Sequence, residues 1–236
     1  MIDIHSHILP GIDDGAGTLN DSVKIVRELA KYGIDNIIAT PHYVNETNFM
    51  SPRVQNAQLL MDLRQRLITE GIETKIFLGN EIYIDQNILD LLKRGKITTL
   101  ANSRYLLVEL PLNDEFPNYE DILRDLIDSD YKVILAHPER YTIVQKDYEV
   151  AKNLSKMGIL FQCNMGSMTG KYGKSAKKLA KRLAKDKMIF TFGSDVHHYG
   201  RSEYLLKAFK KLGKYYSRDE MKKLLVTNPA KILANK

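Results

Sequence analysis

Two histidines one residue apart, His5 and His7, stand at the end of an alternating apolar run near the start of the chain. Side chains at i and i+2 of a strand point to the same face, so the two imidazoles would face one site, as metal ligands do. Asp13 and Asp14 follow in a glycine-bounded loop, residues 11–15, which could return a carboxylate over the strand end. The alternative is that the two histidines bind no metal and simply end a strand, followed by a solvent-exposed acidic turn.

The other histidines and several carboxylates occupy one kind of position. All six histidines fall within a few residues of the carboxyl end of a predicted strand, and the pair Asp195 and His197 repeats the i, i+2 spacing. In a (β/α) barrel these strand ends meet at one mouth. Asp13 and His198 are weaker candidates, because a turn or a surface position accounts for each. The expected metal ligands are His5, His7, Asp14, His42, Glu81, Glu109, His137, Asp195 and His197.

This set of ligands indicates catalytic rather than structural metal. It contains nitrogen and carboxylate oxygen but no thiolate, which suits Mn²⁺, Fe²⁺, Zn²⁺ or Mg²⁺ in open coordination. Nine donors exceed the needs of one ion, and a bridging carboxylate such as Glu81 would allow two or three ions per chain. Closely spaced ions stabilise the attacking and leaving oxygens of a displacement at phosphorus.

Two further residues fit phosphate chemistry. Arg140 and Arg201 follow predicted strands, and a guanidinium binds phosphate oxygens through two parallel hydrogen bonds. Either arginine could instead pair with a loop carboxylate. We expect a catalytic group of Asp14, His42, Arg140 and Arg201, in which Asp14 or His42 orients the attacking water.

The elements that would position these residues alternate along the chain. The first strand-like run contains His5, and the other six cover residues 34–40, 75–78, 105–108, 132–136, 159–163 and 188–192. Helical spacing fills the segments between them and most of residues 202–234. The pattern predicts an α/β fold with a parallel sheet, either a distorted (β/α)₇ barrel or a doubly wound sheet. We favour the barrel, with the metal site at the carboxyl ends of its strands, because no glycine-rich phosphate fingerprint follows the first strand.

Composition sets the remaining expectations. A chain of 236 residues with 44% hydrophobic content can form one domain, residues 1–236. The net charge is +6, and residues 171–187 hold eight basic residues against one acid. This stretch could steer acidic partners, but its apolar stripe favours an amphipathic surface helix. A nucleic-acid-binding or scaffold protein is the rival class, which the intact donor set disfavours; such binding would be salt-sensitive and independent of metal.

A few features of the sequence indicate the cellular compartment and argue against a cysteine-dependent mechanism. No secretory leader begins the sequence and no apolar run approaches about 20 residues, so we expect a cytoplasmic protein without stable membrane insertion. The single cysteine, Cys163, fits a reducing compartment and a buried structural role. A cysteine-dependent phosphatase would need an arginine six residues after its thiolate, and Thr169 stands there.

The motifs resemble those of the PHP (polymerase and histidinol phosphatase) metallophosphoesterases. The matching segments are HSH at 5–7, the histidine of TPHY, the acid of GNE, HPER at 137–140 and SDVH at 194–197. Within that family the opening MIDIHSHILPGIDDG, with TPH, GNEIY and HPERY, is similar to the CpsB/YwqE-type bacterial protein-tyrosine phosphatases of capsular and exopolysaccharide operons.

The resemblance implies a distorted (β/α)₇ barrel and a site with three ions, typically manganese. By it, one ion would be held by His5, His7, Glu81 and Asp195, a second by Glu81, Glu109 and His137, and a third by Asp14, His42 and His197. The implied substrate is the phosphorylated, tyrosine-rich C-terminal tail of a bacterial tyrosine kinase that regulates polysaccharide export. The alternative is a phosphoesterase of the same fold that acts on histidinol phosphate, a nucleotide or a nucleic-acid end.

Overall fold

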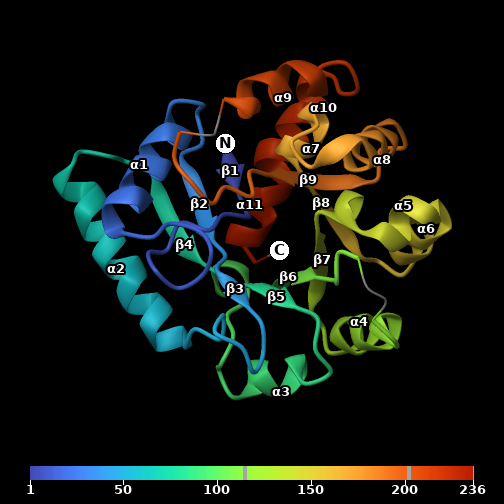
Figure 1. The fold of residues 1–236 in the computed structure, drawn as a ribbon, viewed down its shortest axis with the longest axis horizontal. Coiled ribbons are helices and arrows are strands. Elements are labelled where there is room, and N and C mark those ends of the chain that lie inside the picture. The colour runs from blue at the N-terminus through green and yellow to red at the C-terminus, as the bar shows by residue number, and fades with distance from the viewer. Residues whose placement is uncertain (114–115, 201–202, 236) are drawn as a thin grey trace.

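Parallel strands at the centre, surrounded by helices, make up the architecture (Figure 1). The computed structural model describes residues 1–113, 116–200 and 203–235. One sheet has the order β1 (Ile2–Asp3), β2 (Asn36–Ala39), β4 (Lys75–Leu78). The other has the order β3 (His42–Tyr43), β5 (Glu81–Tyr83), β6 (Tyr105–Glu109), β7 (Lys132–Ala136), β8 (Leu160–Asn164), β9 (Ile189–Gly193). Neighbouring strands pair in parallel throughout.

Two of the predicted strands are interrupted and then resume. After β2 the chain passes Pro41, which has no N–H to donate to a ladder, and then pairs again as β3. After β4 it passes Gly79, where a Cβ would lie 2.8 Å from the side chain of Leu100, and continues as β5. The predicted end of the second strand at Pro41 is confirmed, but the short strands β3 and β5 that follow the two breaks were not predicted. His42 and Glu81 belong to strands, not to loops.

Backbone hydrogen bonds join the first and last strands of the barrel. The N–H of Asp195 donates to the carbonyl of His5 (3.0 Å), and the N–H of His7 donates to the carbonyl of Val196 (2.9 Å). Ser6 and Val196 form a parallel bridge between them. With β2–β3 and β4–β5 each counted as one interrupted strand, the order around the barrel has seven members, which confirms the predicted distorted (β/α)₇ class.

Helices connect the strands. The predicted helices are present as α1 (Leu19–Ala30), α2 (Arg53–Thr69), α3 (Ile88–Lys93), α4 (Tyr119–Asp128), α6 (Tyr148–Lys156), α8 (Gly173–Lys185), α9 (Tyr204–Leu212), α10 (Arg218–Lys222) and α11 (Asn228–Leu233). The side chain of Thr18 caps α1 by accepting from the N–H of Asp21. The patterns did not predict α5 (Thr142–Lys146), α7 (Met165–Thr169), the 3₁₀ turns Leu100–Asn102 and Pro138–Arg140, or the π-helical turn Lys223–Thr227.

Alternation along the strands divides the apolar core. On β6, Leu106 and Val108 join the large cluster that includes the buried faces of the helices, whereas Tyr105 and Leu107 join a smaller cluster with Ile4 and others. Ile232 of α11 belongs to the smaller cluster as well. The barrel interior is therefore filled with side chains, and a functional site is expected at the carboxyl ends of the strands.

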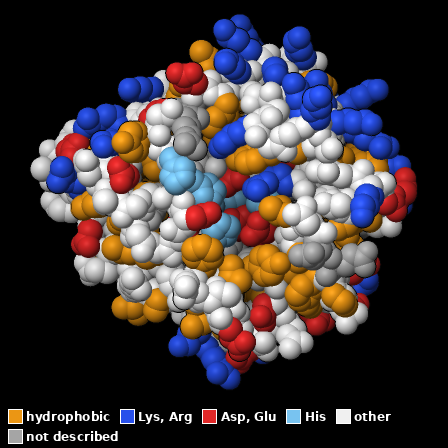
Figure 2. All heavy atoms as spheres, viewed as in Figure 1, with side chains coloured by type: hydrophobic (Ala, Val, Ile, Leu, Met, Phe, Trp, Pro, Cys, Tyr) orange, Lys and Arg blue, Asp and Glu red, His pale blue; other side chains and the backbone are white. Residues whose placement is uncertain are grey.

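That end carries a hollow with histidine and acidic side chains at its floor (Figure 2). Cys163 lies elsewhere, fully buried in β8, and burial raises the pKa of its thiol well above the ordinary value. In the described part of the chain, helices that combine the length and apolarity needed to cross a bilayer are absent.

Candidate metal centre

His5 and His7 point their ring nitrogens at the same place. The His5 Nδ1 lies 2.7 Å from the Gln162 Oε1, and the His7 Nδ1 lies 2.8 Å from Asp13 Oδ2. The Gln162 amide nitrogen donates to Asn164 Oδ1, which fixes the amide oxygen toward His5. Each Nδ1 therefore carries a proton, and the two Nε2 atoms lie 3.2 Å apart. Two neutral rings would repel each other in this arrangement, and a proton or a metal ion at the Nε2 atoms removes the repulsion.

Two carboxylates complete this cluster. Glu81 Oε2 lies 3.1 Å from the His5 Nε2 and 3.3 Å from the His7 Nε2, and Asp195 Oδ1 lies 3.6 Å from each. All four side chains are buried. Burial alone would lower the pKa of His5, but the charges of Glu81 and Asp195 outweigh it and raise this pKa to about 9. The position between these groups thus stabilises positive charge.

A second group shares Glu81. The Glu81 Oε1 lies 2.9 Å from the His137 Nε2, and this nitrogen is also 3.5 Å from Glu109 Oε1. Glu109 Oε2 lies 3.8 Å from the His42 Nδ1. Burial and the nearby charge of Glu81 raise the pKa of Glu109 well above its ordinary value, so this carboxyl lacks sufficient compensating positive charge.

A third group lies at the mouth. Asp14 Oδ1 is 3.3 Å from the His197 Nε2 and 3.6 Å from the His42 Nε2, and His7 lies within reach of the same point. The Asp14 side chain is 55% exposed, in contrast to the buried Glu81. His42 stands between the second and third groups, because its two ring nitrogens face different carboxylates.

The donor atoms fit divalent cations. Among the described residues, Glu81 Oε2 and the His42 Nδ1 are buried without a hydrogen-bond partner, although both face the cluster. Unsatisfied buried donors and acceptors are costly, and cation ligation would satisfy them. All ligand atoms are nitrogen or carboxylate oxygen, the chemistry of open catalytic sites. The structure thus brings the nine expected ligands to one end of the barrel, and the assignment of each to a particular ion stays a prediction.

Several polar residues hold the ligands in place, and among them Gln162, Asn164 and Tyr172 were not predicted from the sequence. Asp195 Oδ2 accepts from Asn164 Nδ2 (2.6 Å), Tyr172 OH (3.0 Å) and Arg140 Nη1 (3.2 Å), which leaves its Oδ1 directed at the histidines. Asp13 and Gln162 orient His7 and His5 as described above. Gln162 and Asn164 have the same i, i+2 spacing on β8 that identified the histidine pair, and this was the signal available in the sequence.

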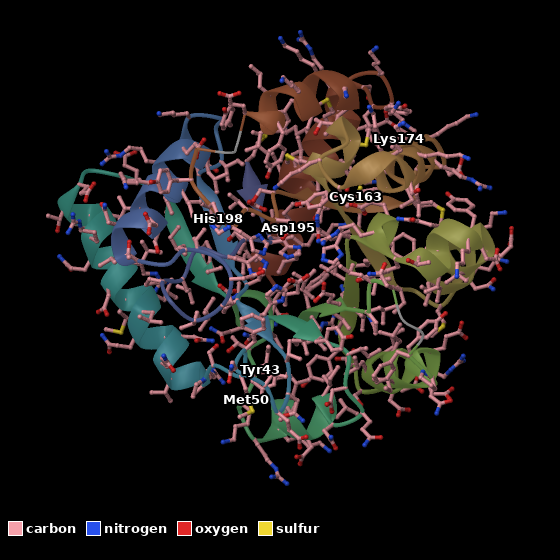
Figure 3. All side chains as sticks on the ribbon, viewed as in Figure 1. Tyr43, Met50, Cys163, Lys174, Asp195 and His198 are labelled. Atoms are coloured by element: carbon pink, nitrogen blue, oxygen red, sulfur yellow. The ribbon has the colours of Figure 1, made fainter. Side chains whose placement is uncertain are left out.

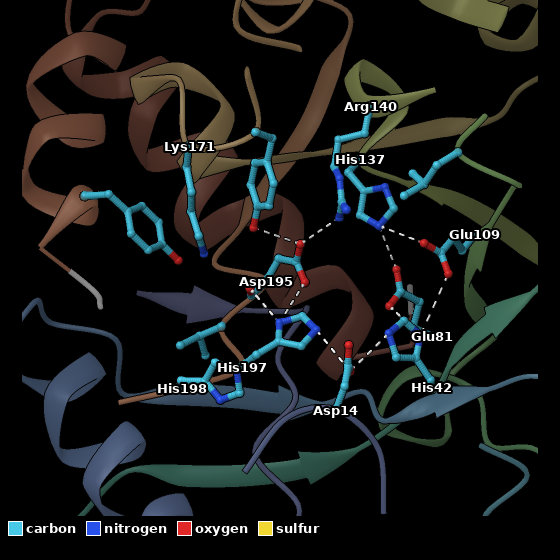
Figure 4. Close-up of a pocket in the computed structure, with 14 residues that line it drawn as sticks. Asp14, His42, Glu81, Glu109, His137, Arg140, Lys171, Asp195, His197 and His198 are labelled. Carbon is cyan, nitrogen blue, oxygen red and sulfur yellow. Dashed lines mark hydrogen bonds and ion pairs between the residues drawn. The ribbon is translucent and has the colours of Figure 1, made fainter. Parts of the chain in front are cut away.

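Above the cluster lies a cavity of about 480 Å³ (Figure 4). Arg140 lines it and stacks on the ring of Tyr172 at 4.6 Å, and Lys171 lies 4.5 Å from the ring centre of Tyr204. His198 lines the wall, but it belongs to none of the three ligand groups. Arg201, the second predicted phosphate ligand, lies outside the described residues. The cavity therefore combines a floor of metal-binding character with cationic side chains on its wall.

A parallel α/β barrel whose strand ends bring imidazoles and a shared carboxylate under an open cavity has the architecture of the metal-dependent hydrolases. The chain belongs to one family with this architecture, described as "Capsular polysaccharide synthesis, CpsB/CapC", whose model matches residues 1–234. The resemblance to CpsB/YwqE-type proteins is thereby confirmed.

Named relatives cover nearly the whole chain. The chain is 33% identical to tyrosine-protein phosphatase YwqE of Bacillus subtilis, over 100% of this chain and 92% of the relative. It is 28% identical to tyrosine-protein phosphatase CpsB of Streptococcus pneumoniae, over 99% and 98%. A crystal structure from work on YwqE and CpsB, described as unique metal-dependent tyrosine phosphatases, superposes with a TM-score of 0.93 at 31% identity, over 100% of this chain and 95% of the other.

More distant structures share only the fold. A β-aspartyl dipeptidase from Fervidobacterium islandicum superposes with a TM-score of 0.57 at 14% identity, over 98% of this chain and 74% of that chain. This likeness supports the barrel architecture alone.

Proposed function

We propose that this chain is a metal-dependent protein-tyrosine phosphatase formed by a single domain, residues 1–236. The observation that carries the proposal is the pair His5 and His7, whose Nε2 atoms face each other at 3.2 Å beside two carboxylates. The tyrosine-phosphatase names of the full-length relatives give the substrate class.

The metal site, as we propose it, uses all nine predicted ligands and most often holds manganese, two or three ions per chain. In this proposal a first ion would be held by His5, His7, Glu81 and Asp195, a second by Glu81, Glu109 and His137, and a third by Asp14, His42 and His197. When bound, such ions activate water and neutralise charge on phosphoryl oxygens.

The protein's own side chains bind and orient the phosphoryl group. Arg140 reaches the cavity with a guanidinium held by Asp195 and by the ring of Tyr172, a geometry suited to two phosphate oxygens. Asp14, half-exposed at the mouth, and His42 are placed to orient water beside the phosphorus atom.

The leaving group and the nucleophile agree with this assignment. A tyrosine phenolate, with a parent pKa of about 10, departs with less protonation than an alkoxide. A thiol nucleophile is excluded because Cys163 is buried and its pKa is raised. No covalent intermediate with the protein is required.

The cellular role follows from the family. We propose that the chain acts in the cytoplasm on the tyrosine-rich tail of a bacterial tyrosine kinase and so regulates capsular or exopolysaccharide synthesis. The family description supports the link to capsule synthesis.

A reconstitution assay tests the proposal. Metal-stripped protein is given Mn²⁺, Fe²⁺, Zn²⁺ or Mg²⁺ separately and assayed on a phosphotyrosyl peptide, histidinol phosphate and a nucleoside monophosphate. We expect metal-dependent turnover of the peptide, fastest with Mn²⁺. Faster turnover of either small phosphomonoester would overturn the substrate assignment in favour of the alternative phosphoesterase, and activity that survives metal removal would overturn the mechanism.

A further inference from the structure

Positive charge is concentrated on one side of the hollow. Helices α7, α8 and α9 contain no aspartate or glutamate, while α8 and α9 contain many lysines. We call the following residues the lysine surface: Lys174, Lys177, Lys181, Lys207, Lys211 and Lys214. In Figure 2 blue side chains gather above and to the right of the hollow, and Figure 3 labels Lys174 on this side.

The helix α7 lies between α8 and α9 and brings their lysines together. The Lys211 Nζ donates to the carbonyl of Met168 in α7 (3.4 Å), and the Lys177 side chain lies against Gly170 at the end of α7. Partial burial and the charges of Lys177, Lys181, Lys214 and Lys207 lower the pKa of Lys211 below its ordinary value. Like charges are thus held together here at a cost, which an anionic partner would reduce.

This surface is continuous with the cavity. Lys171 follows Gly170 directly and lines the cavity wall. Its ammonium lies 4.5 Å from the ring centre of Tyr204, the first residue of α9, and 5.1 Å from that of Tyr172. The positive charge therefore begins beside the site where the phosphoryl group would bind and extends outward over the two helices.

We propose that the lysine surface binds an acidic peptide segment that adjoins the substrate phosphotyrosine. An extended chain advances about 3.3 Å per residue, so residues only a few positions from a phosphotyrosine in the cavity would already lie over α8 and α9. This placement favours a segment covalently joined to the substrate over an anionic membrane, which has no such link to the cavity. The inference rests on the proposed function, whose substrate class it narrows to phosphotyrosine flanked by aspartate or glutamate.

The test compares matched peptides and matched variants. One phosphotyrosyl peptide has Asp and Glu flanks, a second has Asn and Gln at the same positions, and p-nitrophenyl phosphate serves as a substrate without flanks. The test variant is Lys177→Gln/Lys207→Gln/Lys211→Gln. The control variant is Lys31→Gln/Lys96→Gln/Lys156→Gln, which removes equal charge from exposed residues that precede strands, at the opposite end of the barrel.

We expect kcat/KM of the metal-loaded wild type to be about tenfold higher for the acidic peptide than for the neutral one at low salt. The difference should shrink in 0.5 M NaCl, with a Debye length of about 4 Å, and in the test variant, but not in the control variant. Turnover of p-nitrophenyl phosphate should be unchanged in both variants. Equal turnover of the two peptides by the wild type, or an equal loss in the control variant, would overturn the proposal.

A binding assay separates this proposal from the proposed function. Fluorescence polarisation with unphosphorylated fluorescein-labelled peptides measures peptide binding to the lysine surface without catalysis. We expect the wild type to bind the acidic peptide more tightly than the neutral one, and the test variant to lose this preference. If this binding is present while phosphotyrosyl peptides are not hydrolysed, the proposed function fails and the surface assignment stands. The opposite outcome is that the wild type shows no preference between the peptides but sediments with phosphatidylglycerol vesicles, and that the test variant does not sediment. This outcome would assign the lysine surface to membrane binding and overturn the proposal.

Discussion

His42 and Glu81 are register partners in the neighbouring parallel strands β3 and β5, and the His42 Nδ1 lies 3.2 Å from Glu81 Oε2. Both strands are the resumed halves of interrupted strands. Because strand pairing fixes their backbones, the two side chains are held in contact without a loop to position them. Glu81 also reaches His5, His7 and His137, so it is the residue that connects the ligand groups.

Glu81→Gln tests this central role. The amide keeps the shape of the side chain but loses the negative charge and one acceptor. We therefore expect the metal content, measured by mass spectrometry, to fall. Phosphatase activity should drop more than about 100-fold, a larger loss than is typical for residues that only hydrogen-bond to a metal ligand. Glu149→Gln, at an exposed glutamate paired with Lys152, is the control and should change neither. Full metal content with full activity in Glu81→Gln would contradict the bridging assignment.

Tyr172→Phe tests the support of Asp195. The change removes the hydroxyl that donates to Asp195 Oδ2 at 3.0 Å but keeps the ring under Arg140. We expect metal affinity, measured by titration calorimetry, to weaken about tenfold. Tyr204→Phe is the matched control, since this tyrosine lines the same cavity but donates to the Ser194 carbonyl. An equal effect of the two changes would remove the role assigned to Tyr172.

Arg140→Lys tests the phosphate contact. Lysine keeps the charge but cannot form two parallel hydrogen bonds, so we expect kcat/KM for p-nitrophenyl phosphate to fall about 10- to 100-fold. Inhibition by inorganic phosphate should weaken in parallel, because the same contact binds both. Unchanged phosphate inhibition would place the substrate phosphate away from Arg140.

Metal dependence of stability should vary with pH in a defined direction. In the metal-free protein the pKa of His5 is about 9, above its unfolded value of 6.5. His5 therefore stabilises the metal-free fold below pH 6.5, and this contribution is lost as the pH rises through 9. Metal binding needs the neutral ring, so it strengthens over the same range. Thermal unfolding with and without EDTA should show a larger metal-induced rise in Tm at pH 9 than at pH 6.5; the reverse order would contradict the assignment.

Cys163→Ser should leave kcat/KM unchanged, because the thiol is buried in β8 and takes no part in the reaction. Placing a hydroxyl in this site should lower the free energy of unfolding by about 1–3 kcal/mol, measured by urea denaturation. Cys163→Ala separates the two effects, since it removes the sulfur without adding a polar group. Loss of activity in both variants with normal metal content would restore a role for the thiol.

The sequence was sufficient to predict the architecture and the gathering of the nine candidate ligands at one end of the barrel, because alternating strands and helices with polar residues at strand ends have few physical solutions. It was not sufficient for the resumption of pairing beyond Pro41 and Gly79, where His42 and Glu81 begin β3 and β5. The return of a carboxylate by the loop of residues 11–15 was expected, but its division of roles was not. Asp13 contacts the His7 Nδ1 and Asp14 faces the cavity, which depends on the exact path of the loop.

The bonds between His5 and Asp195 and between His7 and Val196 join parts of the chain about 190 residues apart, at the metal centre itself. During synthesis, His5 and His7 leave the ribosome long before Asp195 and His197 are made, and domains fold largely as units. A partly synthesised chain therefore lacks Asp195 and His197, which belong to the sets proposed for the first and third ions. Full loading of the proposed metal centre therefore requires synthesis beyond the last strand, and we expect products that end before Asp195 to be inactive.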